Sequence, residues 1–351
     1  MRKSNLARFV TIGASAFALW AAPMAVANAD AHKEGMPGEG TTVQMSRASW
    51  DTGWFHAEIY KQLLEKLGYT VEGPQTLDNP AFYQAVSQGD VDLWVNGWFP
   101  LHNTYKSTFE RGAEIVGAVA EGGALQGYLV DKASVEEYDI KTLNDFKRDE
   151  VKEAFDRNGD GKADLVACPP GWGCEVTISH HLEVYGLGDH VNPIKAGYAA
   201  SMADAIAAHG QGEPILFYTW TPNWTVNELA PGEDVMWIEV PEVNLPKDQA
   251  ELEDAATLKG VKGCVADPCA LGFPANDIVP VANSEFLNSN PAAKALLENV
   301  SIPLEAIFEQ NAKMQAGEGD AADIENHAAT WIENNSDTVD GWLKAAREAA
   351  M

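Results

Sequence analysis

The chain has few basic residues. Lys and Arg number 24 against 52 Asp and Glu, which gives the 351 residues a formal charge of −28 at pH 7. A surface of this sign repels nucleic acid and anionic lipid headgroups, so we expect no nucleic acid among the partners. Beyond the first 29 residues, no uncharged apolar run reaches the roughly 18 residues that a membrane-spanning helix needs.

Motifs of common catalytic sites are missing as well. The chain contains no Gly-x-Ser-x-Gly elbow, no phosphate-binding P-loop and no His-Glu-x-x-His. His180 and His181 are adjacent in a predicted helix, so they face different directions and have no evident third metal ligand. We therefore expect a binding protein rather than an enzyme, with no catalytic residue, cofactor or metal.

Residues 1–29 have the features of a secretory signal peptide. Three basic residues precede an apolar run over 9–24, and Ala-Asn-Ala at 27–29 is a small-residue cleavage site. The first cysteine is Cys168, so none follows the cleavage site to carry a lipid. We expect a protein exported to the periplasm without a lipid anchor, and a flexible polar tail over 30–41.

The four cysteines form two close pairs, Cys168 with Cys174 and Cys264 with Cys269. An even count in an exported chain predicts disulfides, and pairing by proximity gives two small loops. The alternative is a zinc site of four thiolates. Neither spacing is the Cys-x-x-Cys of zinc ribbons, and an oxidising compartment disfavours it.

Strand and helix patterns alternate along the chain, which predicts an α/β fold with largely parallel sheets. In such sheets ligands bind beyond the carboxyl ends of the strands. The predicted strands are 42–47, 69–72, 91–95, 215–218 and 278–281. The predicted helices are 56–67, 81–88, 176–185, 199–209, 286–297, 303–314 and 324–350.

Three tryptophans lie where Pro and Gly end such elements. They are Trp98 in Asn-Gly-Trp-Phe-Pro, Trp172 in Pro-Pro-Gly-Trp-Gly-Cys and Trp220 in Tyr-Thr-Trp-Thr-Pro. Three indoles that converge form an aromatic cage for a quaternary ammonium ion. The alternative for each is ordinary loop packing. Trp54, beside the first strand–helix turn, is a further candidate for the lining of the cleft.

Donors for an anionic group accompany these indoles. His102 follows Trp98 by four residues, and a disulfide-held turn can aim the successive backbone N–H groups of Gly173 and Cys174 at one anion. A packing role is the alternative for His102. A carboxylate beside a cation describes a zwitterionic ligand.

Residues 156–164 resemble the start of a calcium-binding EF-hand loop. Oxygen-bearing residues at loop positions 1, 3, 5 and 9 and glycine at position 6 fit the pattern, but position 12 is Ala167 instead of the bidentate Glu. The alternative, which we favour, is a loop of Asx turns.

At these residues the chain resembles the periplasmic glycine betaine/proline betaine-binding proteins of ABC importers, over nearly all of its expected mature length. The shared strings are 98–102, 126–132, 158–165, 170–175, 218–222 and 340–342. The resemblance implies a type II periplasmic-binding-protein fold with two crossovers, in which 42–128 plus 272–351 form lobe I and 129–271 form lobe II.

The resemblance also implies roles for single residues. Trp98, Trp172 and Trp220 would surround the trimethylammonium group, while His102 and the N–H groups of Gly173 and Cys174 would hold the carboxylate. The backbone carbonyl of Asp131 would face the cation, and the bridge between Cys168 and Cys174 fits the family.

The implied partners are the betaine ligand and an ABC permease and ATPase in the inner membrane. We expect the protein itself to be a monomer. Another onium solute, dimethylsulfoniopropionate or choline, is the alternative ligand. Two features depart from the family pattern: Asn96-Gly97 before Trp98, and the second cysteine pair near the return crossover.

Overall fold

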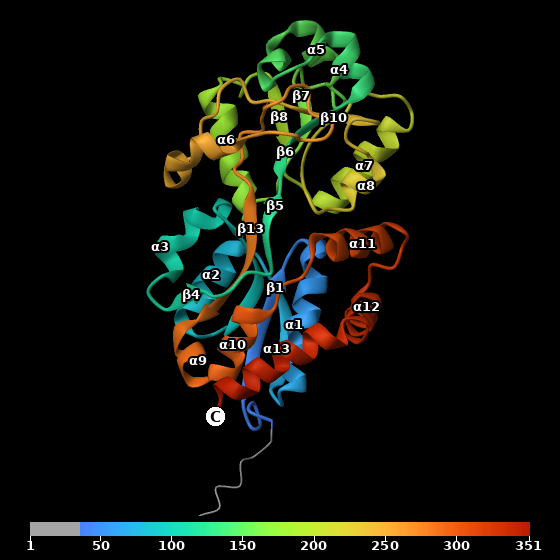
Figure 1. Cartoon of the computed structure of the whole chain (residues 1–351). Helices are drawn as coiled ribbons and strands as arrows, with labels where there is room; N and C mark the ends of the chain where they lie inside the picture. The colour runs from blue at the N-terminus through green and yellow to red at the C-terminus, as the bar shows by residue number, and fades with distance from the viewer. Residues whose placement is uncertain (1–35) are drawn as a thin grey trace, which may run out of the picture. The chain divides into compact units, whose positions relative to one another are not determined.

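The computed structural model describes residues 36–351, which build two lobes, each a β-sheet flanked by helices (Figure 1). The predicted signal peptide and residues 30–35 lie outside the described residues. Residues 36–41, the end of the predicted tail, form a turn on the first lobe. In this turn the backbone N–H of Gly38 donates to the carbonyl of Leu67 at 2.9 Å.

The first sheet has the strand order β2-β1-β3-β13-β4, and β5 also pairs with β13. Its strands are β1 (Thr42–Ala48), β2 (Thr70–Leu77), β3 (Leu93–Phe99), β4 (Ala113–Ile115), β5 (Ala120–Ala124) and β13 (Asn276–Asn283). Strand β1 is parallel to β2 and β3, whereas β13 is antiparallel to β3, β4 and β5.

The second sheet has the order β10-β6-β9-β7-β8. Its strands are β6 (Gln126–Asp131), β7 (Ala163–Val166), β8 (Val191–Ile194), β9 (Leu216–Trp220) and β10 (Val235–Ile238). Strand β6 is antiparallel to both of its neighbours, and β7 is parallel to both of its own. A separate pair joins β11 (Thr257–Leu258) to β12 (Cys269–Ala270).

Both sheets are mixed, so the prediction of largely parallel sheets is wrong. The reason is the path of the chain between the lobes. Strand β5 continues through Leu125 into β6, and the chain returns through 271–275 into β13. A strand that crosses between lobes enters its sheet from the opposite end, so it pairs antiparallel with strands already there.

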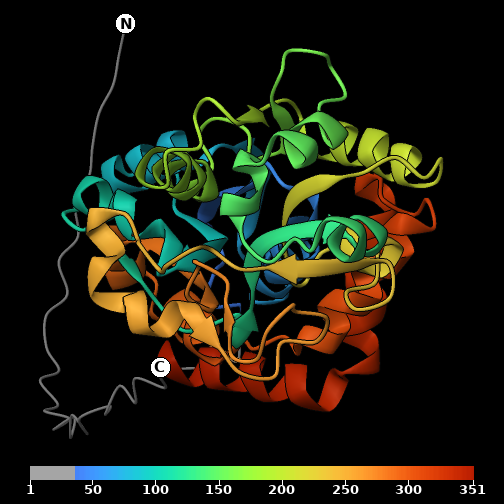
Figure 2. The ribbon, with the colours of Figure 1, turned by 90° about the horizontal axis from the view of Figure 1, so that it is seen from above.

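Helices cover both sheets. Those of the first lobe are α1 (Trp54–Lys66), α2 (Asn79–Gln88), α3 (Lys106–Phe109), α9 (Ser284–Ser289), α10 (Pro291–Asn299), α11 (Leu304–Gln315), α12 (Ala321–Asn334) and α13 (Ser336–Ala349). Those of the second lobe are α4 (Lys132–Tyr138), α5 (Asp149–Ala154), α6 (Gly173–Val184), α7 (Tyr198–His209) and α8 (Thr225–Glu228). The 3₁₀ helices among residues 36–351 are η1 (Asp51–Gly53), η2 (Leu101–Tyr105), η3 (Leu143–Lys147) and η4 (Lys247–Ala256). Figures 1 and 2 show α6 and α7 on opposite sides of the second sheet.

Two predicted C-terminal helices are each divided in two. The predicted helix 286–297 is broken at Asn290, because Pro291 excludes the residue before it from the helical region; Asn290 has φ −131° and ψ 71°. The predicted helix 324–350 begins earlier, at Ala321, and is interrupted at Asn335 between α12 and α13.

The division into lobes follows from the two crossings. We propose that 36–124 with 276–351 form the first lobe and 126–271 the second, since β5 pairs within the first sheet and β6 within the second. The predicted boundary between residues 128 and 129 falls inside β6. The return boundary at 271–272 falls in the connection before β13.

Candidate functional site

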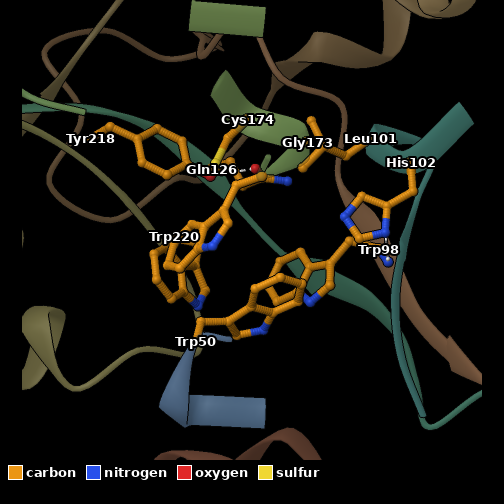
Figure 3. A pocket seen from close by; sticks show the side chains of 10 residues that line it. Trp50, Trp98, Leu101, His102, Gln126, Gly173, Cys174, Tyr218 and Trp220 are labelled. Carbon is orange, nitrogen blue, oxygen red and sulfur yellow. Dashed lines mark hydrogen bonds between the residues drawn. The ribbon is translucent and has the colours of Figure 1, made fainter. Parts of the chain in front are cut away.

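A pocket is lined by residues of both lobes (Figure 3). The lining comprises Trp50, Trp98, Leu101 and His102 of the first lobe and Gln126, Trp172, Gly173, Cys174, Tyr218 and Trp220 of the second. Six of the seven predicted binding residues are among them. The wall of the pocket is therefore mainly aromatic and contains four indoles.

The predicted tryptophans lie at the ends of elements, although not just beyond strands as expected. Trp98 is the penultimate residue of β3 and Trp220 is the last residue of β9. Pairing with neighbouring strands extends both, since Trp98 lies opposite Ile278 and Trp220 opposite Gln126. Trp172 directly precedes α6.

The indoles meet at steep angles. The ring centroids of Trp172 and Trp220 lie 5.7 Å apart with 75° between the planes, and those of Trp50 and Trp172 lie 5.3 Å apart at 71°. Trp98, Trp172 and Trp220 are each no more than 7% exposed. Rings that meet edge to face can present several π faces to one point, which is the geometry that attracts an onium cation.

Trp50 is the cage residue that the sequence reasoning missed. It follows the carboxyl end of β1, beside β3, so its position after a parallel strand was a usable signal. Trp54, the candidate named instead, is not part of the lining. Its indole donates to the carbonyl of Ala48 at 2.9 Å, and the guanidinium carbon of Arg47 lies 3.6 Å from its ring centroid.

Asn96 holds two of the four indoles. Its Oδ1 accepts from Nε1 of Trp50 at 2.6 Å and from Nε1 of Trp98 at 2.9 Å. Its Nδ2 lies 2.7 Å from Nδ1 of His56. Burial lowers the pKa of His56 to about 3, so this ring is neutral and Nδ1 can accept. Asn96, one of the residues that depart from the family pattern, is thus the centre of a buried hydrogen-bond network beneath the cage.

Trp172 is held across the gap between lobes. Its Nε1 donates to Oγ of Ser49 at 2.9 Å, and that hydroxyl donates to Oδ1 of Asp78 at 2.6 Å. Ser49 and Asp78 belong to the first lobe. One wall of the cavity therefore depends on contact between the lobes.

The first turn of α6 offers two free donors. The backbone N–H groups of Gly173 and Cys174 have no acceptor among residues 36–351, as expected for the first positions of a helix. Their partial positive charge favours an anion there. The bridge between Cys174 and Cys168 ties this turn to the preceding loop.

His102 lines the cavity, but both of its ring nitrogens have partners. Nδ1 accepts from the backbone N–H of Trp98 at 3.1 Å and lies 2.7 Å from the hydroxyl of Tyr83. Because Nδ1 accepts, the neutral ring carries its proton on Nε2. This N–H donates to the side-chain amide of Asn79, 2.9 Å away, when the amide is turned so that its oxygen faces the ring. Burial lowers the pKa of His102 to about 3. A bond from His102 to a ligand requires Asn79 to give way.

Asp131 is the predicted residue that the structure does not bring to the cavity. It ends β6, whereas the cavity residue Gln126 begins that strand. The carboxylate of Asp131 caps α4 by accepting from the backbone N–H of Ser134 at 2.8 Å, and also accepts from that of Ile215 at 3.0 Å. Asp131 therefore stabilises the start of α4 and does not line the pocket.

The remaining predicted features lie elsewhere. Cys264 is bonded to Cys269, which lies in β12 just before the return crossing. With all four sulfurs in disulfides, no thiolate remains for zinc. In the loop 156–164, Asp156 accepts three backbone N–H groups, the pattern of Asx turns. Within residues 36–351, no group of three or more His, Cys, Asp or Glu is placed to hold a metal ion.

Comparison with known proteins supplies the context for this geometry. Residues 41–334 match the family described as the substrate binding domain of ABC-type glycine betaine transport systems. The chain is 40% identical over 316 residues to the glycine betaine-binding periplasmic protein OusX of Dickeya dadantii, covering 90% of this chain and 92% of that protein. It is 37% identical over 343 residues to the glycine betaine/proline betaine-binding periplasmic protein of Salmonella typhimurium, covering 97% and 99%.

A solved structure has the same fold. Lactococcal OpuAC in complex with glycine betaine gives a TM-score of 0.64 at 19% identity, covering 86% of this chain and 99% of that one. The predicted two-lobed type II α/β fold is confirmed. In the part of the chain from residue 36 onward, no helix is long and apolar enough to cross a membrane. This chain belongs to the family of substrate-binding domains of ABC-type glycine betaine transport systems.

Proposed function

We propose that the chain captures glycine betaine and proline betaine in this cavity for an ABC importer. The proposal rests chiefly on one observation: four indoles line the same pocket as Gly173 and Cys174, whose helix N–H groups have no acceptor among residues 36–351. A quaternary ammonium donates no strong hydrogen bond, so it is bound through π faces, while the carboxylate takes the N–H groups of Gly173 and Cys174. His102 is a proposed additional donor that becomes available when Asn79 gives way.

The strengths of these contacts suffice. A desolvated cation–π contact contributes roughly 0.5–2 kcal/mol, and a charge-assisted hydrogen bond roughly 1.5–3 kcal/mol. Micromolar binding needs about 8 kcal/mol, which three or four indoles and two backbone donors reach. Because the lining comes from both lobes, the ligand bridges them and favours their contact.

The proposed role extends to location and partners. Residues 1–29 direct export to the periplasm, and the monomer delivers its ligand to an ABC permease and ATPase in the inner membrane. Periplasmic relatives and two disulfides, which persist in oxidising compartments, support export. The protein performs no covalent chemistry, so glycine betaine incubated with it should be recovered unchanged by NMR.

Calorimetric titration with glycine betaine tests the proposal. We expect micromolar binding by the intact protein and none by a Trp98→Ala, Trp172→Ala, Trp220→Ala variant, while Trp342→Ala in α13 binds normally. Choline lacks the carboxylate and should bind more weakly, whereas dimethylsulfoniopropionate keeps both charges and is the competing ligand. Absence of binding to glycine betaine, with tight binding of the sulfonium zwitterion, would transfer the role to that solute.

A further inference from the structure

Gln126 is a cavity residue with no role in the site as described so far. It begins β6 and lies directly opposite Trp220 on β9. Side chains alternate along a strand, so Tyr218 and Trp220 share one face of the sheet with Gln126. All three line the cavity, and Gln126 is only 1% exposed.

The two ends of the Gln126 amide differ. Oε1 accepts from the hydroxyl of Tyr218, whose pKa is raised well above 10 by burial, so that the phenol keeps its proton. Nε2 is buried and has no partner among residues 36–351. An unpaired buried donor is costly unless something else binds there. In Figure 3 this nitrogen points away from Tyr218, toward the side of the cavity where Gly173 and His102 lie.

We propose that Nε2 of Gln126 donates a hydrogen bond to the carboxylate of the bound zwitterion, beside the N–H groups of Gly173 and Cys174. This inference rests on the proposed function. A carboxylate offers about four lone-pair sites, so two backbone donors leave room for a third. Both ring nitrogens of His102 are engaged with its own lobe. Two side-chain donors of the lining have no partner among residues 36–351, Nε2 of Gln126 and Nε1 of Trp220, and the indole of Trp220 already serves the cation through its π face.

The neutrality of this donor suits a small zwitterion. In such a ligand the ammonium lies only a few bonds from the carboxylate, so an Arg or Lys that held the carboxylate would repel the caged cation. An amide provides the hydrogen bond without that repulsion. Tyr218 fixes which end of the amide faces the ligand, and so acts as a positioning residue.

The test compares glycine betaine with choline, which carries the ammonium without the carboxylate. Gln126→Leu should weaken glycine betaine binding about 10- to 100-fold, the loss of one charge-assisted hydrogen bond, and leave the Kd for choline within about threefold. Gln126→Glu should weaken glycine betaine at least as much and tighten choline. Gln310→Leu, which removes a buried amide from α11 outside this cavity, is the matched control and should change neither.

A second readout distinguishes hydrogen bonding from packing. In Gln126→Glu, burial and the nearby ligand carboxylate raise the pKa of the new carboxyl above its ordinary value of about 4.3. The protonated carboxyl can donate, so glycine betaine affinity should recover as the pH falls from about 7.5 toward 5. Equal losses for both ligands in Gln126→Leu, or no recovery in Gln126→Glu, would overturn this role while leaving the proposed function intact. Failure of the intact protein to bind glycine betaine would overturn both.

Discussion

The two lobes hold their halves of the cage differently. In the first lobe, Trp50 and Trp98 both donate to Asn96, at 2.6 and 2.9 Å, and Asn96 is tied to the buried ring of His56. Every partner in this network belongs to the same lobe. The first half of the cage is therefore organised whether or not the lobes meet.

The second lobe has no such network around its indoles. Trp172 donates across the gap to Ser49, and Nε1 of Trp220 has no acceptor among residues 36–351. Within the same described residues, the N–H groups of Gly173 and Cys174 also have no acceptor. The comparison indicates a rigid platform in the first lobe and a second half completed by lobe contact and by ligand. We expect ligand to dock on the first lobe before the second joins it.

The largest expected effect comes from breaking the platform. Asn96→Leu leaves two buried indole N–H groups without an acceptor, each costing about 1–3 kcal/mol, so the free energy of unfolding should fall by about 4 kcal/mol. Urea unfolding measures this loss. Trp220→Phe removes an indole N–H that has no partner and should lose far less. If both variants lost the same free energy of unfolding, the first lobe would not hold its indoles more firmly than the second.

The variant Gly173→Ala tests whether the lobes must come together to bind ligand. A Cβ at this position would lie 2.8 Å from Cδ2 of His102 and 3.1 Å from Cγ of Leu101, both on the opposite lobe. Overpacking costs about 1–3 kcal/mol, so glycine betaine affinity should fall about 10- to 100-fold. The free energy of unfolding without ligand should hardly change, because parted lobes relieve the clash.

The control for this variant is Gly188→Ala, which meets no atom within 4 Å. It should leave the affinity in calorimetric titration unchanged. A large loss of stability in Gly173→Ala would place the clash inside one folded unit rather than between lobes.

The same contrast explains what the sequence could predict. Trp98, Trp172 and Trp220 were predictable because Pro and Gly stop the elements that carry them, and local chain chemistry is visible in sequence. The α/β alternation and the disulfide pairs were visible for the same reason. Trp50 has no such neighbours. Its one signal in the sequence was its position after the predicted strand 42–47, and its place beside β3 depends on strand pairing.

The errors share one cause, which is that contacts between distant segments leave no local pattern. Asp131 lies only five residues from the cavity residue Gln126, but an extended strand carries it to the far end of the sheet. The ring of His102 is occupied by Tyr83 and Asn79 from α2, which a motif around position 102 cannot reveal. The antiparallel β13 follows from the return crossing.

Acid should weaken the first lobe more than the second. Burial lowers the pKa of His56 and His102 in the first lobe, and of His181 in the second, to about 3. Unfolded histidine takes a proton below about pH 6.5, so this stability is complete above that pH and is lost as the pH falls toward 3. At pH 5 each histidine should cost about 2 kcal/mol.

Urea unfolding at a series of pH values from about 7.5 to 5 measures how the free energy of unfolding changes with pH. This range spans the pKa of histidine in the unfolded chain, about 6.5. His181→Gln removes one of the three groups and should reduce the histidine contribution by about a third. An unchanged slope in that variant would mean that carboxylates, rather than buried rings, govern acid sensitivity.

The smallest expected effect belongs to the hydrogen bond that joins the lobes. Ser49→Ala removes the acceptor of Trp172 Nε1, a loss of about 1 kcal/mol, or about fivefold in glycine betaine affinity. Ser179→Ala, whose hydroxyl contacts Glu175 and Lys195 within the second lobe, is the control and should keep full affinity. If Ser49→Ala instead lowered the stability of the ligand-free protein by the same amount, the lobes would already be in contact before binding, and the second half of the cage would be as preorganised as the first.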